Sequence, residues 1–503
     1  MKNTLWYLSP NKNFMGKFNK AKKSVSTATV NLAGGKAFKQ STKLELLSLV
    51  LTSFLKDKFY ESGKEQQDRL VDLIQRLEDK KFVAKAAIYA RNVFGMRSVT
   101  HVMAGELVKS VKGEQWVKNA INQVVHRPDD MLEILSYVRT DKDTPIPNSL
   151  KKGLALAINN FSPYQLAKYK ASNSGFKMVD LVNLVHPKIK SELEECIKNL
   201  VEGELKNANT WERKLSDAGQ AVKEIENDEE KEEKLEELKS NAWKELITEK
   251  KIGIFALLRN LRNIAKQSPE SIDAACELLV NEEAIKKSLI LPFRFKTAYD
   301  NLKTTDRRIV SAVSKALDIS VSNVPKLPGK TAVVIDTSGS MTGFTNDAPI
   351  NKASIFAAIL YKSNNADLYQ FSERCSEMKV NPDDTVMTIS KYIEEKAFNG
   401  GTDFSTIFPE LKKKYERVII LSDMQGWMES SYCSPSKTFK DYKKNYNDNV
   451  KVFSFDLNGY GTLEFPERNV ICLAGWSDKV FDLMAVAEED KDAMIKKIEQ
   501  IEL

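Results

Sequence analysis

Apolar residues recur every three or four positions from about residue 41 to residue 319, which is the spacing of amphipathic helices. Leu44, Leu47 and Leu51 form one such face near the start of this part. Prolines stand between the periodic segments, where they would end helices. Further helices are predicted at residues 66–95, 98–111, 116–125, 131–138, 150–160 and 163–169.

Many helices of similar length with short connections are typical of stacked helical hairpins, an α-solenoid, although no exact repeat is visible. A compact helical bundle is the alternative. Residues 224–238 contain nine acidic residues and two lysines. Good helix formers throughout indicate a solvated helix rather than an acidic recognition tail, so we expect a charged helical insertion at residues 221–240.

After residue 321 the pattern changes to short apolar runs that alternate with helical segments. Strands are predicted at Thr331–Asp336, Asp367–Phe371, Arg417–Ser422, Lys451–Asp456 and Val470–Leu473, and helices near residues 352–362, 388–396, 404–414 and 478–501. This βαβ alternation predicts a doubly wound, mostly parallel α/β sheet. With a linker at residues 325–329, the chain divides into domains at 1–325 and 326–503.

Charge is unevenly distributed between these two domains. Residues 326–503 hold 22 Lys and Arg against 27 Asp and Glu, a net −5, whereas the whole chain carries +7, so residues 1–325 carry +12. This asymmetry indicates that the first domain meets polyanions, although solvated helical surfaces rich in lysine would look the same.

No run of about 18 apolar residues is available to span a bilayer, and the first 22 residues lack an apolar signal core. The five cysteines are far apart and have no metal-ligand spacing with the three histidines. We expect a cytoplasmic, monomeric protein with reduced cysteines and no membrane partner.

Oxygen donors cluster where predicted strands end. Asp336, Ser338 and Ser340 follow one strand, Asp423 follows another, and Thr402 follows a Gly-Gly turn. Because carboxyl ends of parallel strands meet at one edge of a sheet, these loops are expected to converge. Two carboxylates with three hydroxyls suit a small hard cation such as Mg²⁺, although a purely structural role is also open.

A catalytic role for this cluster has little support. No G-x-S-x-G elbow is present around Ser338, and His101, His126 and His186 all lie in the helical half. Nuclease or phosphatase activity would rest on the carboxylates alone. We therefore do not expect an enzyme.

The combination of Asp336-x-Ser338-x-Ser340 with Thr402 and Asp423 resembles the metal-ion-dependent adhesion site of von Willebrand factor A domains. The resemblance implies that these five residues bind Mg²⁺, directly or through water. It also implies that one coordination position stays open for an acidic oxygen of a protein partner.

Three helical segments, at residues 89–101, 256–264 and 290–295, resemble the TROVE module of Ro ribonucleoproteins, in which a von Willebrand A domain follows. The resemblance implies a closed ring of HEAT-type helical repeats sealed by the A domain. It further implies binding of small noncoding Y RNAs on the ring surface and of single-stranded ends of misfolded or structured RNAs in the central hole. A role in RNA quality control or degradation follows, with an exoribonuclease as an associated partner.

The family's residues for RNA contact can be transferred to this chain mainly between residues 167 and 186. Lys168 and His186 match family positions, Ser172 stands where the family has Arg, and Lys170 is close enough to supply the missing charge. Arginines in the three matching segments could bind phosphate or could join helical hairpins. The alternative function is a metal-dependent protein-interaction platform that binds an acidic partner and has no direct RNA role.

Overall fold

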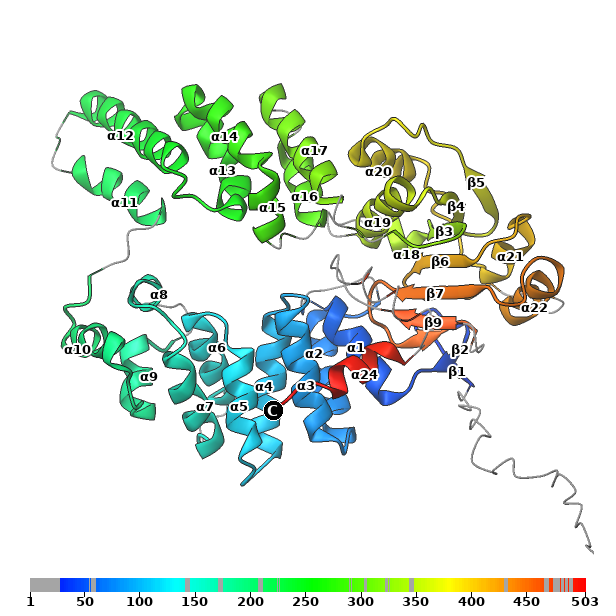
Figure 1. The fold of residues 1–503 in the computed structure, drawn as a ribbon, viewed down its shortest axis with the longest axis horizontal. Helices are drawn as coiled ribbons and strands as arrows, with labels where there is room; N and C mark the ends of the chain where they lie inside the picture. Colours follow the sequence, from blue (N-terminus) through cyan, green and yellow to red (C-terminus); the bar gives the residue numbers. More distant parts are fainter. Residues whose placement is uncertain are drawn as a thin grey trace, which may run out of the picture.

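The first part of the chain is helical, as its periodicity predicts, and its helices stack side by side along an arc (Figure 1). The computed structural model of the protein describes residues 28–503 except residues 54, 56–59, 141–144, 171–174, 207–210, 224, 226, 289, 291, 303–304, 322–323, 325, 343–347, 429–432, 466–469, 474–479, 481–483, 485–486 and 488–491. Neighbouring helices along the chain pack on one another, for example α3 on α4 and α13 on α14, which is the packing of a solenoid.

The helices of this part are α1 (Thr42–Thr52), α2 (Gly63–Arg76), α3 (Lys80–Asn92), α4 (Ser98–Ser110), α5 (Trp116–Val124), α6 (Pro128–Val138), α7 (Asn148–Ile158), α8 (Pro163–Lys168), α9 (Met178–Val185), α10 (Glu194–Glu202), α11 (Trp211–Ala221), α12 (Asp228–Thr248), α13 (Ile254–Gln267), α14 (Ile272–Leu279), α15 (Glu282–Ser288), α16 (Pro292–Leu302) and α17 (Arg307–Val321). Short 3-10 helices occur at Ser191–Leu193 and Pro269–Ser271.

Local capping explains why the segment predicted at residues 66–95 is two helices. The Ser62 hydroxyl accepts from the Glu65 backbone N–H at 3.2 Å and begins α2. The Asp79 carboxylate accepts from the Phe82 N–H at 3.0 Å and begins α3. A side chain that bonds free N–H groups stabilises a new helix start even where the apolar pattern continues.

The charged segment expected at residues 221–240 includes the acidic first half of α12. The second half of the same helix is packed against the solenoid, since Trp243, Leu246 and Ile247 are buried. The Trp243 indole donates to the Gln267 side chain of α13 at 2.8 Å. The helix is therefore an integral layer of the solenoid with a solvated acidic end.

The second part of the chain contains a six-stranded sheet in the order β5-β4-β3-β6-β7-β9. All neighbouring pairs are parallel except β4 with β5. The five predicted strands are confirmed with the same bounds as β3 (Thr331–Asp336), β4 (Asp367–Phe371), β6 (Arg417–Ser422), β7 (Lys451–Asp456) and β9 (Val470–Leu473), and β5 (Cys375–Met378) is added at the edge.

Helices cover both faces of this sheet. Val333 and Ile335 pack in one apolar cluster with α19, whereas Ala332 and Val334 pack in another with Phe408 and its neighbours. The helices are α18 (Gly339–Thr342), α19 (Pro349–Asn364), α20 (Val386–Glu395), α21 (Ile407–Glu410), α22 (Pro435–Asn445) and α24 (Ala493–Glu499), with a 3-10 helix at Phe404–Thr406. The helix predicted at residues 404–414 is thus shorter, and much of the one at 478–501 lies outside the described residues.

The two parts are joined at both ends of the helical arc. Strand β1 (Ala28–Val30) pairs with β2 (Lys36–Lys39), and β2 pairs with β8 (Thr462–Leu463) of the second part. In return, α24 packs on α3, and Lys85 donates to the Glu499 carbonyl at 2.6 Å. At the other end α16 packs on α19 and α17 on α20, so the sheet domain lies between the two limbs of the arc (Figure 1).

The two domains expected at residues 1–325 and 326–503 therefore exchange segments. Strand β2 of the first pairs with β8 of the second, and α24 of the second packs on α3 of the first. Among the described residues, no helix combines the length and the apolar character that crossing a bilayer requires.

Candidate functional sites

The five residues of the predicted metal site meet at one edge of the sheet. Asp336 ends β3, and its carboxylate accepts from the Ser338 N–H at 2.9 Å and from the Ser422 hydroxyl at 2.5 Å. The Ser338 and Ser340 hydroxyl oxygens are 3.4 Å apart. Asp423 follows Ser422 directly at the end of β6, the strand paired with β3.

Backbone contacts place the Thr402 loop beside these residues. The Gly339 N–H donates to the Gly400 carbonyl at 3.0 Å, and the Asn399 N–H donates to the Thr337 carbonyl at 2.9 Å. All five site residues are buried, and the most exposed of them, Ser340, is only 6% exposed. Their convergence is what the strand pattern predicts, and their role as metal ligands stays a prediction.

The two buried carboxyl groups of this cluster, Asp336 and Asp423, lie in an environment that favours a bound positive charge. Burial raises the pKa of Asp336 to about 6, against the effect of hydrogen bonds from Ser338 and Ser422. Burial and then the charge of Asp336 raise the pKa of Asp423 well above its usual range. Neither carboxylate oxygen of Asp423 has a hydrogen-bond partner of good geometry among the described residues, although the nearby Ser340 hydroxyl favours its charged form.

These residues fit a small hard cation. A buried carboxylate without a partner is costly, and a divalent ion would satisfy it and separate the charges of Asp336 and Asp423. No group of three His, Cys, Asp or Glu residues within the described chain is arranged to hold a metal. A cation at this edge would therefore depend on the hydroxyls of Ser338, Ser340 and Thr402 as well.

A tyrosine of the helical part covers this site, which the sequence did not reveal. Tyr60 lies between α1 and α2, and its ring meets that of Tyr460 edge-on with centroids 5.8 Å apart. Burial and then the charge of Asp423 raise the pKa of the Tyr60 phenol, while a hydrogen bond with the Ser340 side chain lowers it. The candidate metal site therefore faces the seam between the two parts of the chain.

The loop that carries Tyr460 is held tightly in this seam. The Asp456 carboxylate accepts from the N–H groups of Gly459 and Gly461 at 2.7 and 2.9 Å. The Arg69 guanidinium of α2 donates to the Gly459 carbonyl at 2.7 Å. Gly459 has a φ of +68°, and a Cβ there would lie 2.2 Å from the Thr52 hydroxyl, so the close approach requires glycine.

The predicted RNA-contact residues are not equally available. His186 is exposed in a left-handed conformation at the end of α9. Lys168 lies in the last turn of α8, with its ammonium 5.6 Å from the centre of the Tyr169 ring. The Lys170 ammonium instead donates to the Leu205 carbonyl, which makes it a link to the chain after α10. Ser172 lies outside the described residues.

Arg127 also lies in this region, and no sequence pattern predicts its position there. Its guanidinium lies 4.8 Å from the centre of the same Tyr169 ring, and it is paired with Asp129. Lys168 and Arg127 thus hold two positive charges beside one aromatic ring. Tertiary packing, not sequence spacing, brings them together.

The arginines of the three matching segments, which could bind phosphate or join helical hairpins, lie in two kinds of environment. Arg91 and Arg97 bind the buried Asp130 carboxylate of α6, each at 2.7 Å. The same carboxylate accepts from the backbone N–H groups of His126 and Arg127. These two arginines join α3 and α4 to α6. Arg259 is exposed beside Phe255, and Arg262 donates to the Asn301 carbonyl at 3.4 Å.

His101 belongs to the same buried cluster. Its Nδ1 is 3.0 Å from a Glu133 carboxylate oxygen and its Nε2 is 3.2 Å from Asp130. Burial lowers the pKa of His101, but the hydrogen bonds with Asp130 and Glu133 outweigh burial and raise it. The pKa of Asp130 is lowered because His101 and the two arginines outweigh the cost of burial.

Four lysines that no sequence pattern singled out line a pocket of the helical part. A pocket between the end of α4 and the starts of α5 and α7 is lined by Lys109, Lys112, Lys118 and Lys152, with Glu114 as the acidic residue among its lining. Lys109 is paired with Glu106 at 2.9 Å. The other three have no carboxylate within 4.0 Å among the described residues, so this surface favours anions.

Known proteins share the arrangement of a helical solenoid followed by a sheet domain. A family model described as the TROVE domain matches residues 36–239 and 206–336. Among solved structures, the Ro (RSR) protein of Deinococcus radiodurans superposes with a TM-score of 0.60 and 17% identity, covering 90% of this chain and 100% of that one. At that identity the likeness concerns the fold.

Curated relatives match the chain over a shorter region. Telomerase protein component 1 from Rattus norvegicus and that from Mus musculus are each 21% identical over 322 residues. The matched region is 47% of this chain and 12% of each relative. The chain therefore spans a small part of the length of these relatives.

Proposed function

Because the chain belongs to the TROVE domain family and has the fold of a Ro protein, we propose that it is a non-enzymatic RNA-binding scaffold. The observation that carries the proposal is the family match along the helical part, which also holds the +12 charge. Unpaired lysines at the end of α4 support it, since phosphate contacts supply much of the affinity for nucleic acid.

In this proposal small noncoding, Y-like RNAs lie on the surface of the helical arc, and single-stranded ends of misfolded or structured RNAs enter its centre. An exoribonuclease associated through the RNA would connect this cytoplasmic, monomeric scaffold to RNA quality control or degradation. Ultraviolet crosslinking in the host, followed by sequencing of the RNA that copurifies, tests it. Recovery of small structured RNAs is expected; RNA no more abundant than with an unrelated basic protein would contradict it.

Lys168 and His186 are proposed as RNA contacts in the helical part. Replacing both by alanine should weaken binding of a structured RNA and reduce the slope of log affinity against log salt by about 1, because one phosphate contact is lost. Fluorescence anisotropy at several salt concentrations measures both quantities. Lys170 is left intact because its ammonium bonds the Leu205 carbonyl.

The matched control is Lys234→Ala, which removes an exposed lysine from the acidic half of α12, where it is paired with Glu237. We expect unchanged RNA binding for this variant. Equal losses in the double variant and in the control would show that general charge, and not the surface around Tyr169, governs affinity.

The sheet domain is proposed to be of the von Willebrand A type, with Asp336, Ser338, Ser340, Thr402 and Asp423 holding Mg²⁺. The orphaned oxygens of Asp423 support this assignment. When bound, the cation supplies positive charge between two buried carboxylates. Because Tyr60 of the helical part covers these residues, their occupancy is proposed to stabilise the seam between the two parts.

The alternative function, capture of an acidic protein at the metal site, predicts a different result. Protein partners would then survive ribonuclease treatment and be lost on addition of a chelator in a pull-down. Partners lost with ribonuclease and retained with the chelator would favour the RNA scaffold.

A further inference from the structure

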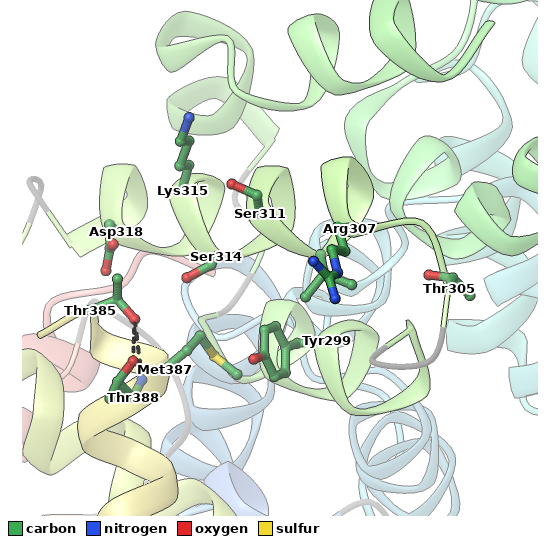
Figure 2. Close-up of a pocket in the computed structure, with 11 residues that line it drawn as sticks. Tyr299, Thr305, Arg307, Ser311, Ser314, Lys315, Asp318, Thr385, Met387 and Thr388 are labelled. Atoms are coloured by element: carbon green, nitrogen blue, oxygen red, sulfur yellow. Dashed lines mark hydrogen bonds between the residues drawn. The ribbon is translucent and has the colours of Figure 1, made fainter. Parts of the chain in front are cut away.

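A pocket lies where the last helices of the arc meet the sheet domain (Figure 2). Helix α17 forms one wall, Tyr299 of α16 another, and the start of α20 a third. Its lining includes Tyr299, Arg307, Ser314, Lys315, Asp318 and Met387. It shares no residue with the metal site or with the surface around Tyr169.

The cations of this pocket are available to a ligand. Arg307 and Lys315 are exposed, and neither has a carboxylate within 4.0 Å among the described residues. The adjacent Arg308, by contrast, forms ion pairs with Asp306 at 2.8 Å and Asp273 at 3.0 Å. Of these two neighbouring arginines, therefore, only Arg307 has a guanidinium without an ion-pair partner among the described residues.

The acidic residue of the lining is distant from Arg307. Asp318 accepts from the Val386 N–H at 3.1 Å, which ties it to the start of α20. Asp318 stands eleven positions after Arg307 along α17, which is about 16 Å at the helical rise. Figure 2 shows Asp318, Thr385 and Thr388 grouped on one side and Arg307 on the other. The Arg307 end of the pocket is therefore positive.

Apolar and hydroxyl groups lie beside the Arg307 guanidinium. Figure 2 places Tyr299 and Met387 next to each other at the middle of the pocket, with Ser314 above them. The Lys391 ammonium lies 5.1 Å from the centre of the Tyr299 ring and adds positive charge. An aromatic ring, a thioether, hydroxyls and an unpaired guanidinium together match the parts of a nucleotide: base, sugar and phosphate.

We propose that this pocket binds one nucleotide of single-stranded RNA, with the phosphate at Arg307 and the base against Tyr299 and Met387. The inference rests on the proposed function, because it assumes that the chain binds RNA. A nucleotide held here contacts α17 and α20 at once, so the RNA strand would connect the helical arc to the sheet domain at the seam opposite Tyr60.

Two single variants of the full chain test the proposal. Arg307→Ala should weaken binding of an RNA hairpin with a single-stranded 3′ tail about tenfold, since a hydrogen bond to a charged group contributes roughly that factor. Arg308→Ala should change the affinity less than twofold. Both residues are exposed, so thermal unfolding should match the wild type and show that both variants fold.

Photocrosslinking locates the contact and separates the outcomes. With 4-thiouridine in the tail, we expect crosslinked peptides that contain Tyr299 or Met387, reduced by Arg307→Ala and not by excess uridine monophosphate. RNA binding without such crosslinks and without loss in Arg307→Ala would overturn the pocket and leave the scaffold standing. Competition by the mononucleotide would assign a free nucleotide instead. No RNA binding by the wild type would overturn both.

Discussion

Replacing Asp130 by alanine is expected to lower the free energy of unfolding of the helical part by about 3–5 kcal/mol. The carboxylate is fully buried and meets the guanidinium groups of Arg91 and Arg97 at 2.7 Å. Without it, the Arg91 guanidinium stays buried and loses its carboxylate, whereas Arg97 keeps its ion pair with Asp129. The N–H groups of His126 and Arg127 also lose their acceptor. An uncompensated buried charge costs more than the ion pair contributes.

Native-state hydrogen exchange of α3, α4 and α6 measures this loss, because it reports the helices that Asp130 joins. The control is Asp273→Ala, which breaks the ion pair of Arg308 at the surface, where Asp273 is 72% exposed. An exposed pair contributes at most about 1 kcal/mol. Equal effects of the two substitutions would show that the buried cluster does not hold the arc together.

Removal of the candidate cation is expected to destabilise the seam. The free energy of unfolding should rise by about 2.7 kcal/mol when Mg²⁺ is supplied at one hundred times its dissociation constant, and Asp423→Asn should abolish that gain. The metal-free variant should unfold no more easily than the metal-free wild type, because the amide removes a buried charge that repels Asp336.

Thermal unfolding with Mg²⁺ or with chelator measures this gain. Asp403→Asn is the matched control, because Asp403 lies next to Thr402 but accepts from the Ser405 N–H at 2.8 Å, a role that asparagine can also fill. A gain retained in Asp423→Asn, or lost equally in Asp403→Asn, would contradict the five-residue metal site.

The strands were predictable because each central strand is a short apolar run buried on both faces. Val333 and Val334 pack on opposite sides of the sheet, and this demand for apolar residues at every position is visible in the sequence. The edge strand β5, Cys375–Met378, has one buried residue among four and therefore carries no such signal. Strands β2 and β8 pair across more than 400 residues, and the local sequence pattern contains no trace of that pairing.

The convergence of the five oxygen-donor residues was predictable for the same reason as the strands, since donors that follow parallel strands share one edge, and their role as metal ligands stays a prediction. Its cover was not, because Tyr60 reaches Ser340 only through the packing of α1 and α2 against the loop at Gly459. The roles of arginines likewise depend on packing. Arg91 and Arg307 are chemically alike, but one meets a buried carboxylate and the other an open pocket.

Direct binding of RNA tests the central claim. A labelled RNA hairpin with a free 3′ tail should bind the full chain at low salt, and log affinity should fall linearly with log salt, by about 0.7 to 0.9 for each phosphate contacted. An isotherm that shows no binding at low salt, or an affinity that does not change with salt, would contradict the account.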